Sequence, residues 1–527
     1  MNLKICVAQI NTTVGNFSQN RAKILEALRL AQKAKADLIT FPEATVTGYP
    51  PEDLLFKKKF IDENLNTLRS ILPYTAGLTA AIGFVDRDKS GRIFNAAAIF
   101  ANKKWTATYR KTWLPNYGVF DEKRYFAAGN TPLVIRIKNA RVGLSICEDI
   151  WQQESFVYRP EYAGSVSLLV NISASPYQQG KEKEREALLS RLARKVHAPV
   201  VYHNLVGGQD ELVFDGGSMI LDASGKIIRQ AARFEEEIFT LDMAAPTKST
   251  FKPLKSEEEV YRALILGTRD YIRKNGFKKV LLGLSGGIDS ALVGCLAVDA
   301  IGKENVIGVT MPSQYTSNET YRDAKQLAKN LGIECLEFKI KAIFDSYRKT
   351  LKTAFKKLPE SVAEENLQTR IRGNLLMALS NKFGHLVLTT GNKSEIATGY
   401  CTLYGDMAGG FAVIKDVPKT LVFRLARYRN SLTKAPAIPP SIIKRPPTAE
   451  LKFNQRDQDT LPPYETLDRI LDAYVEKDLS YNDKLSRRVA KMVDKNEYKR
   501  RQAPPGVKIT PKAFGRDRRM PITHNFD

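Results

Sequence analysis

Short apolar runs alternate with amphipathic stretches along most of the 527-residue chain. In the first half, Lys4 to Gln9 predicts a strand, Asn20 to Ala34 has the apolar spacing of a helix, and Asp37 to Phe41 predicts a second strand. This order is typical of an α/β sandwich. The same pattern predicts further strands at Thr79 to Val85, Asn95 to Phe100, Arg141 to Ile146, Ser167 to Asn171, Pro199 to Tyr202, Phe214 to Leu221 and Glu237 to Leu241.

Residues 246–256 lack an apolar period and predict a linker between a first domain, residues 1–245, and a second, residues 257–527. The second domain opens with a predicted helix, Glu257 to Arg273, and Ser256 is the expected N-cap. Strands alternating with helices then predict a doubly wound parallel sheet. Its later strands are predicted at Val306 to Thr310, Glu334 to Ile340 and Leu386 to Thr390, and Leu432 to Pro447 is expected to be a mobile loop.

Composition narrows the class of protein. An apolar content of 43% and a charged content of 26% are those of a soluble globular protein. The five cysteines contain no Cys-x-x-Cys pair, and the four histidines show no metal-ligand spacing, so a reducing compartment and oxygen ligands for any metal are expected. No apolar run is long enough to span a bilayer, which predicts a cytoplasmic protein. The net charge of +24 favours the binding of polyanions, or it serves only to keep the protein soluble.

The stretch Val280 to Ser290 predicts a buried strand, a Gly-rich turn and the start of a helix. Gly286 and Gly287 allow close approach of a ligand, and the helix start offers unpaired N–H groups to phosphate. Asp289 beside a phosphate requires a bridging cation, which predicts Mg²⁺. An ordinary Ser/Gly turn is the alternative. The string Ser-Gly-Gly-x-Asp-Ser resembles the pyrophosphate loop of adenylating ATP pyrophosphatases, which cleave ATP between the α and β phosphates.

Three reactive side chains each close a strand-like run in the first half: Glu43, Lys111 and Cys147. Each alone has a structural explanation. Together they offer a proton acceptor, a cation for an oxyanion, and a thiol whose place at a helix start favours a lowered pKa. The order Glu, Lys, Cys, with the phrases FPEATVTGYPPEDLL and YRKTWLPNYGVFDEKRYF, resembles the nitrilase/amidase superfamily over about the first 245 residues.

That resemblance implies an αββα sandwich that hydrolyses an amide. Glu43 is the implied general base, Lys111 the stabiliser of the tetrahedral intermediate and Cys147 the nucleophile. Matching positions imply that Tyr117, Ser175 and Lys181 bind glutamine, and that Glu122 is a second carboxylate orienting Lys111. Relatives carry Arg where this chain has Lys181, so a fixed bidentate grip on the glutamine carboxylate is not expected.

In the second half, Asn366, Arg370 and Asn374 recur at a spacing of four, which predicts one helix face suited to a phosphate-bearing substrate. Glu395 follows a predicted strand end and is either a second Mg²⁺ carboxylate or a helix-capping acid. With GYCTLYGDMAGGFAVIKDVPKT and PPTAELKFNQRDQDTLPPYETLD, this half resembles an NAD synthetase domain of the adenine nucleotide alpha hydrolase type. Both halves in this order resemble the glutamine-dependent NAD⁺ synthetase family.

The family resemblance implies a carbon-nitrogen ligase that uses glutamine as amide donor. Its implied substrates are L-glutamine, ATP and nicotinate adenine dinucleotide (deamido-NAD⁺), with Mg²⁺ held by Asp289 and Glu395. Asn366, Glu395 and Lys508 would contact the dinucleotide, although Leu403 departs from a family lysine. The residues implied to bind ATP are Gly283, Leu284, Ser285, Gly286, Gly287, Ile288, Asp289, Ser290, Thr390 and Lys419.

Ammonium is not nucleophilic, so an enclosed path for ammonia between the two sites is expected. The resemblance also implies a homo-oligomer and no membrane or nucleic-acid partner. Two alternatives remain open. The charge of +24 favours an RNA-modifying enzyme with the same ATP chemistry, and a catalytically inactive nitrilase-like scaffold that binds partners is the other.

Overall fold

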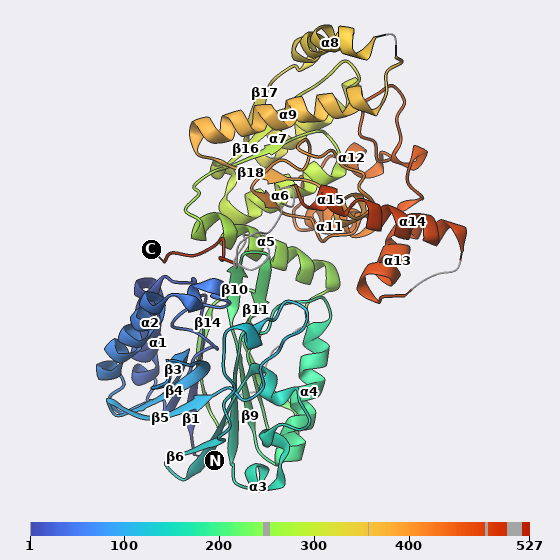
Figure 1. Cartoon of the computed structure of the whole chain (residues 1–527). Coiled ribbons are helices and arrows are strands. Elements are labelled where there is room, and N and C mark those ends of the chain that lie inside the picture. The colour runs from blue at the N-terminus through green and yellow to red at the C-terminus, as the bar shows by residue number, and fades with distance from the viewer. Residues whose placement is uncertain (1, 246–252, 357, 480–482, 503–518, 527) are drawn as a thin grey trace. The chain divides into compact units, whose positions relative to one another are not determined.

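The computed structural model describes residues 2–245, 253–356, 358–479, 483–502 and 519–526. The chain divides into two compact units (Figure 1). The first contains the described residues up to Leu254 together with 519–526, and the second contains those from Lys255 to 502. Within the described ranges, no helix is long and apolar enough to cross a membrane.

The first unit is built on two six-stranded sheets and a hairpin. One sheet has the order β14 (Glu237–Asp242), β1 (Lys4–Gln9), β2 (Leu38–Thr40), β3 (Thr79–Arg87), β4 (Ile93–Ala101) and β5 (Lys104–Arg110). The other has the order β13 (Ile227–Gln230), β12 (Met219–Leu221), β9 (Val200–Asn204), β8 (Leu168–Ser173), β7 (Ala140–Ile146) and β6 (Leu133–Ile137). The hairpin pairs β10 (Val206–Gln209) with β11 (Leu212–Asp215).

The alternating side-chain directions along β1 explain how the layers form. Cys6 and Ala8 pack in a core with helices α1 (Phe17–Lys33) and α2 (Lys58–Ile71), whereas Ile5 and Val7 pack in a core shared with the second sheet. That second core also contains the apolar face of α4 (Lys181–Val196), and the short α3 (Pro160–Ala163) precedes β8. Strands with two buried faces are therefore covered by helices on the outside, which confirms the predicted αββα sandwich.

The last described residues, 519–526, pack on the first unit. The ring of Phe526 lies 5.0 Å from that of Phe60 and 6.2 Å from that of Phe17, and Asn525 donates its N–H to the carbonyl of Val14 at 3.0 Å. The predicted boundaries gave residues 257–527 to the second domain, so the structure differs from them here. An apolar residue near a chain end does not reveal from sequence which core will bury it.

The second unit has one five-stranded, wholly parallel sheet. Its order is β17 (Glu334–Glu337), β16 (Val306–Thr310), β15 (Val280–Gly283), β18 (Leu386–Thr389) and β19 (Phe411–Ala412). The chain moves outward through β16 and β17 and then returns to the other side of β15. The carboxyl end of β15 is thus a topological switch point, where ligands bind in such sheets.

Neighbouring residues of β15 face opposite helical layers. Leu282 packs in the core that contains α5, α6, α7 and α11, and Leu281 packs in the core that contains α8 and α9. This confirms the doubly wound α/β fold. The helices are α5 (Ser256–Lys274), α6 (Ile288–Ile301), α7 (Asn318–Leu331), α8 (Lys341–Phe355), α9 (Val362–Phe383), α10 (Lys393–Thr398), α11 (Lys419–Ser431), α12 (Pro440–Lys444), α13 (Tyr464–Leu471), α14 (Lys484–Lys495) and α15 (Glu497–Arg500).

Three predicted segments differ from the structure. The single strand expected at Phe214 to Leu221 is two strands, because Gly216 and Gly217 both have positive φ and break the extended run. Ser256 is already helical and Lys255 occupies the N-cap position. The expected mobile loop from 432 to 447 contains α12, and the side chains of Ile438 and Ile442 are buried. Most of the predicted linker, residues 246–252, lies outside the described residues.

Candidate active sites

The first unit brings together three buried side chains that follow strand ends. Glu43 comes after β2, Lys111 directly after β5 and Cys147 directly after β7, and each is at most 3% exposed. The ammonium Nζ of Lys111 lies 2.7 Å from Glu43 Oε1 and 2.9 Å from Glu122 Oε1. Asn95 also donates to Glu43 Oε1, at 2.7 Å. A base, a cation and a thiol therefore share one water-poor site.

Two carboxylates keep Lys111 charged. Burial alone would lower its pKa, but the charges of Glu122 and Glu43 hold the pKa well above its usual value. Burial raises the pKa of Glu122 to about 7, against the opposing effect of Lys111. Glu122 Oε1 accepts the hydroxyl of Tyr49 at 2.9 Å, and Oε2 has no hydrogen-bond partner among the described residues. Glu122 thus lies where a carboxylate that orients Lys111 would lie.

The Cys147 turn is held by one buried acid. Cys147 has a left-handed backbone, φ +42°, at the start of a short 3₁₀ helix. Asp149 accepts the N–H of Ile146 at 2.8 Å through Oδ2, and the N–H groups of Thr112 and Trp113 at 3.1 and 2.9 Å through Oδ1. Since Thr112 follows Lys111, a single carboxylate fixes the thiol and the cation relative to each other.

The resting thiol of Cys147 is neutral. Burial raises its pKa well above the usual value, the charge of Glu43 raises it further, and Lys111 acts in the opposite direction. The expectation of a pKa lowered by a helix start is therefore wrong. Four residues of 3₁₀ helix give little dipole, and burial beside a carboxylate outweighs it. Deprotonation of Cys147 requires a base at the moment of attack, and Glu43 is placed to act as one.

The residues predicted to bind glutamine lie around this centre. Tyr117 donates its hydroxyl to Glu148 Oε2 at 2.9 Å, and Glu148 is the buried neighbour of Cys147. Ser175 is 6% exposed and follows Ala174, whose N–H donates to Glu43 Oε2 at 2.7 Å. Lys181 lies 2.8 Å from Glu184 and 4.4 Å from the centre of the Trp151 ring. Sequence reasoning missed Glu148, for which adjacency to Cys147 was the available signal.

The second unit carries the Gly-rich turn at the end of β15. Gly286 has φ +80°, and a Cβ there would meet the carbonyl oxygen of Thr320 at 2.3 Å. Ser290 Oγ accepts the N–H of Ser285 at 3.3 Å and donates to the carbonyl of Gly287 at 3.0 Å. A pocket of about 280 Å³ opens above this turn, and its lining includes Thr310, Met311 and Thr390. Only glycine fits at position 286, because its φ is positive and the Thr320 carbonyl fills the place of a Cβ.

Two carboxylates from different strand ends meet in this pocket. Lys419 Nζ lies 2.5 Å from Asp289 Oδ2 and 2.9 Å from Glu395 Oε1, and all three side chains line the cavity. Asn392 donates to Asp289 Oδ1 at 2.9 Å and also caps α10 reciprocally with Glu395. Burial raises the pKa of Glu395 to about 7, although Lys419 opposes the shift. Glu395 is therefore both a capping acid and a partner of Lys419.

The acidic pair suits a hard cation that a ligand also coordinates. Among the described residues, no group of three or more His, Cys, Asp or Glu side chains is arranged to hold a metal ion. Magnesium bound through one or two carboxylates takes its other ligands from phosphate and water, and the ammonium of Lys419 already stands where positive charge is favoured. Asp289 and Glu395 fit such a role.

Side chains of α9 contact two places, the 402–403 segment and the pocket. Asn366 accepts the hydroxyl of Thr402 at 2.7 Å, and Arg370 donates to the carbonyl of Leu403 at 3.2 Å, so both contact the 402–403 segment. Arg372 lines the pocket instead and donates to the carbonyl of Met311 at 3.1 Å. Burial lowers the pKa of Arg372 to about 10. Sequence reasoning missed Arg372, and Lys508 lies outside the described residues.

Comparison with known proteins accounts for both halves. Residues 4–250 match the carbon-nitrogen hydrolase family and residues 260–503 match the NAD synthase family. Over 99% of its length the chain is 49% identical to the glutamine-dependent NAD(+) synthetase of Thermotoga maritima, and it covers 99% of that protein. The chain belongs to the glutamine-dependent NAD⁺ synthetase family.

Other members of the glutamine-dependent NAD⁺ synthetase family agree. The Aquifex aeolicus protein is 45% identical over 99% of this chain and 100% of its own length. The solved structure of the Acinetobacter baumannii member, in complex with ADP, is 42% identical and superposes with a TM-score of 0.86, covering 100% of this chain and 99% of its own. The resemblance predicted from sequence is therefore confirmed over both halves.

Proposed function

We propose that this chain converts deamido-NAD⁺, ATP and glutamine to NAD⁺, AMP, pyrophosphate and glutamate. One observation carries the proposal. A chain of the glutamine-dependent NAD⁺ synthetase family holds a buried Glu43–Lys111 pair beside Cys147 in one unit, and in the other a Gly-rich turn and Asp289 line one pocket. The first arrangement suits amide hydrolysis, and the second suits attack on a nucleotide α-phosphate.

In the first unit Glu43 takes the proton of Cys147 as sulfur attacks the glutamine amide carbon. The ammonium of Lys111 stabilises the oxyanion, and the proton then leaves with ammonia as a thioester forms. Water activated by Glu43 releases glutamate. Tyr117, Ser175 and Lys181 would bind glutamine, and buried Glu148 is placed to pair with its α-ammonium group.

In the second unit the nicotinate carboxylate attacks the α-phosphate and pyrophosphate leaves. Ammonia then adds to the acyl adenylate, loses a proton and displaces AMP. Asp289 and Glu395 would hold Mg²⁺, which supplies positive charge to the phosphates. Lys419 moderates the repulsion between these two acids. The turn from Gly283 to Ser290 would bind the nucleotide, with the main-chain N–H groups at the start of α6 as donors.

Further contacts follow from the pocket lining. Thr390 and Arg372 line the cavity and would contact ATP. Asn366, Glu395 and Lys508 would contact deamido-NAD⁺, as the family resemblance implies. Arg372 is the residue that sequence reasoning did not assign. Its guanidinium is directed by the carbonyl of Met311, at the end of β16, where an adenosine would lie in a doubly wound sheet.

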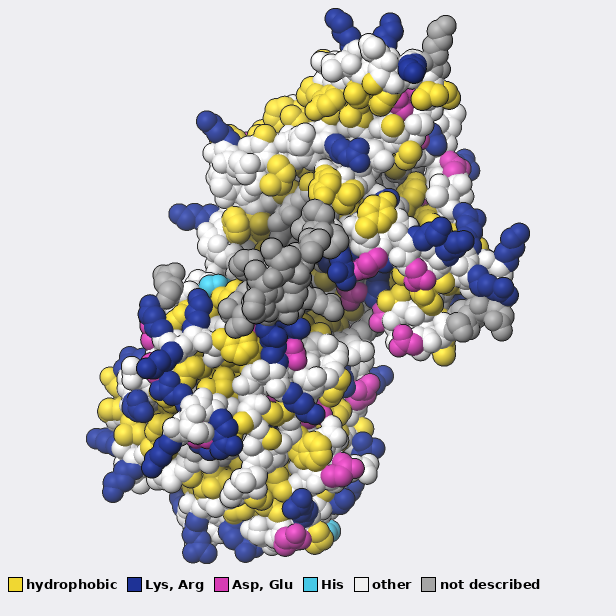
Figure 2. Space-filling view, in the orientation of Figure 1, with side chains coloured by type: hydrophobic (Ala, Val, Ile, Leu, Met, Phe, Trp, Pro, Cys, Tyr) yellow, Lys and Arg dark blue, Asp and Glu magenta, His cyan; other side chains and the backbone are white. Residues whose placement is uncertain are grey.

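The cysteines and the family resemblance bear on the compartment and the assembly. All five cysteines are free of disulfides, which supports a reducing compartment such as the cytoplasm. The family resemblance supports a homo-oligomer, and light scattering measures its mass. On the face shown in Figure 2, Lys and Arg side chains are spread over both units, which supports solubility rather than an RNA surface as the role of the charge.

Isotope transfer tests the proposed activity. Deamido-NAD⁺ that carries ¹⁸O at both oxygens of its nicotinate carboxylate is incubated with the protein, ATP, Mg²⁺ and glutamine. The products NAD⁺ and AMP are then analysed by mass spectrometry. One ¹⁸O should appear in AMP for each NAD⁺ formed, because the carboxylate oxygen becomes the bridge of the adenylate. AMP without label, or no NAD⁺, would reject the proposal.

A further inference from the structure

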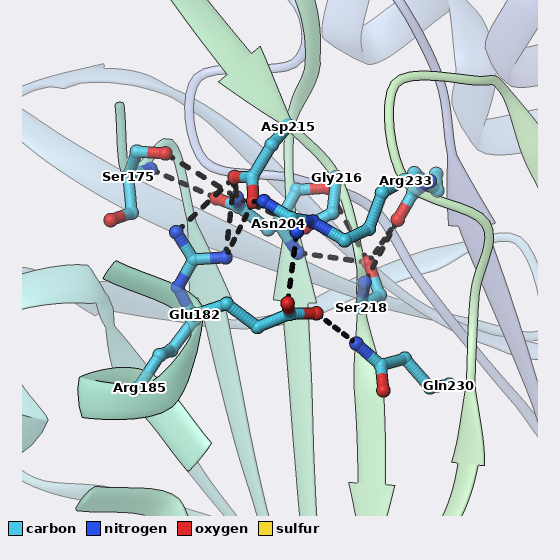
Figure 3. A network of polar contacts seen from close by, with 10 residues as sticks. Ser175, Glu182, Arg185, Asn204, Asp215, Gly216, Ser218, Gln230 and Arg233 are labelled. Carbon is cyan, nitrogen blue, oxygen red and sulfur yellow. Dashed lines mark hydrogen bonds and ion pairs between the residues drawn. The ribbon is translucent and has the colours of Figure 1, made fainter. Parts of the chain in front are cut away.

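A network of charged side chains in the first unit adjoins Ser175 and the start of α4, two places proposed to bind glutamine (Figure 3). Arg185 donates through both terminal nitrogens to Asp215, at 3.2 to 3.3 Å, and Arg233 donates to the other side of Asp215 at 3.0 Å. Arg233 also donates to Glu182 at 2.8 Å. Arg185 is 0% exposed and Asp215 is 1% exposed. Two arginines and two acids thus balance one another inside the first unit.

The network reaches Ser175 through a single amide. Asn204 Oδ1 accepts the N–H of Ser175 at 2.9 Å, and its Nδ2 donates to the carbonyl of Ser175 and to Asp215 Oδ1, both at 3.3 Å. Asn204 therefore grips both main-chain groups of one residue, as Figure 3 shows. The preceding residue, Ala174, donates its N–H to Glu43. The same short segment is fixed between Asn204 and the general base.

The network also anchors the helix that begins at Lys181. Glu182 and Arg185 lie in the first turns of α4, and both are bonded to residues of the second sheet or its hairpin. Gln230, on β13, donates to Glu182 at 3.0 Å. The start of α4 therefore cannot shift without breaking buried ion pairs. The same charged network therefore positions both Ser175 and Lys181, two residues proposed to bind glutamine.

Stability alone does not explain this arrangement. Burying Arg185, Asp215 and Arg233 costs solvation, and apolar residues of similar volume often serve as well or better. None of the four charges is placed at the reacting atoms in the proposed chemistry. What they do uniquely is fix two separate glutamine contacts at once, since a paired and hydrogen-bonded charge tolerates little displacement.

We propose that the Arg185–Asp215 pair, acting through Asn204, is a positioning unit that sets the affinity of the first unit for glutamine. This rests on the proposed glutamine hydrolysis. The unit holds Ser175 and the start of α4 in the geometry that recognises the amino-acid end of the substrate. Its only link to the reacting centre is indirect, through the N–H of Ala174 on Glu43, so its loss raises KM for glutamine more than it lowers kcat.

Two variants test the proposal. Arg185→Met combined with Asp215→Asn removes one positive and one negative charge and leaves Arg233 paired with Glu182. Asn204→Ala keeps all four charges and removes the grip on Ser175. The matched control, Arg87→Met combined with Asp62→Asn, breaks an ion pair of 2.7 Å in the same unit but outside the network. Thermal unfolding checks that each variant is folded.

Each variant is assayed for glutamine hydrolysis and for inactivation at Cys147. A diazoketone analogue of glutamine reports recognition, and iodoacetamide reports the thiol alone. Both test variants should raise KM for glutamine about tenfold with kcat changed less than about threefold. They should slow inactivation by the analogue about as much as KM rises and leave alkylation by iodoacetamide near wild type. The control should change neither rate.

Three results would overturn the inference. KM within twofold of wild type in both folded test variants would show that the network does not position the segment. Equal slowing of both inactivation reactions would show a general structural role. If wild-type protein does not hydrolyse glutamine, the proposed function falls and takes this inference with it, whereas the first two results overturn this inference alone.

Discussion

Lys419 donates a hydrogen bond to Asp289, with Nζ 2.5 Å from Oδ2, and the same ammonium lies 2.9 Å from Glu395. Asp289 lies in the first turn of α6 after β15, and Glu395 follows β18, so the two acids come after the ends of neighbouring parallel strands. Lys419 is the first residue of α11 and is 2% exposed. Three segments remote in sequence are thus joined by one buried cation.

Lys419→Met should destabilise the second unit by about 3 kcal/mol, because it leaves two neighbouring acids without their cation. It should abolish NAD⁺ formation from glutamine and from ammonium alike, while glutamine hydrolysis continues. Lys415→Met, the same change at an exposed position four residues earlier, is the control. Loss of the ammonium-driven reaction in the control, or its retention in Lys419→Met, would contradict the assignment.

The same site predicts a pH dependence. The pKa of Glu395 is raised from its usual 4.5 to about 7 by burial, so the folded protein keeps a proton that the unfolded chain has lost. This group's contribution to stability is therefore complete below pH 4.5 and falls as the pH rises through 7. Lys419→Met removes the opposing charge, so the fall should extend to higher pH. Melting curves between pH 5 and 9 measure it, and an unshifted profile would refute the coupling.

Glu43→Gln distinguishes two effects of Glu43, its role as proton acceptor and its effect on the pKa of the Cys147 thiol. Glutamine hydrolysis should fall by about a hundredfold or more because the proton acceptor is lost. Alkylation of Cys147 by iodoacetamide should nevertheless become faster at pH 8. The charge of Glu43 raises the thiol pKa, whereas that of Lys111 lowers it. Mass spectrometry of the Cys147 peptide gives the rate, and slower alkylation than in wild type would contradict the electrostatic account.

Gly286→Ala and Gly276→Ala form a matched pair. Both glycines have positive φ, +80° and +78°, so both alanines should cost about 1 kcal/mol of backbone strain. At Gly286 the added Cβ also meets the Thr320 carbonyl at 2.3 Å, whereas at Gly276 no described atom lies within 4 Å of it. Gly286→Ala should therefore cost a further 1 to 3 kcal/mol, by rough analogy with overpacking, and weaken ATP binding. Urea unfolding and the KM for ATP compare them, and equal effects would refute the steric explanation.

The predictions from sequence succeeded where a signal was local. The apolar runs at Lys4–Gln9 and Val306–Thr310 have the bounds of β1 and β16, because a strand that is buried on both faces is a continuous apolar run in the sequence. Glu43, Lys111 and Cys147 were found because each closes a strand. The structure brings them to one site, although their chemical roles remain predictions.

What the sequence did not reveal depends on contacts between distant segments. The period of α9 predicted a face with Asn366, Arg370 and Asn374, but nothing in that period indicated that Arg372 would line the pocket. Asp149 joins the segments after β5 and β7, and Lys419 joins Asp289 to Glu395. No spacing of residues in the sequence predicts either contact. The pKa of Cys147 follows burial that only packing supplies.

The most direct test compares wild type with Cys147→Ala. NAD⁺ formation from deamido-NAD⁺, ATP and Mg²⁺ is measured with glutamine or with ammonium as the nitrogen source. The variant should lose the glutamine-driven reaction and keep the ammonium-driven one, because the thiol serves hydrolysis alone. Retention of the glutamine-driven reaction by the variant, or failure of wild type to form NAD⁺ from either source, would contradict the account.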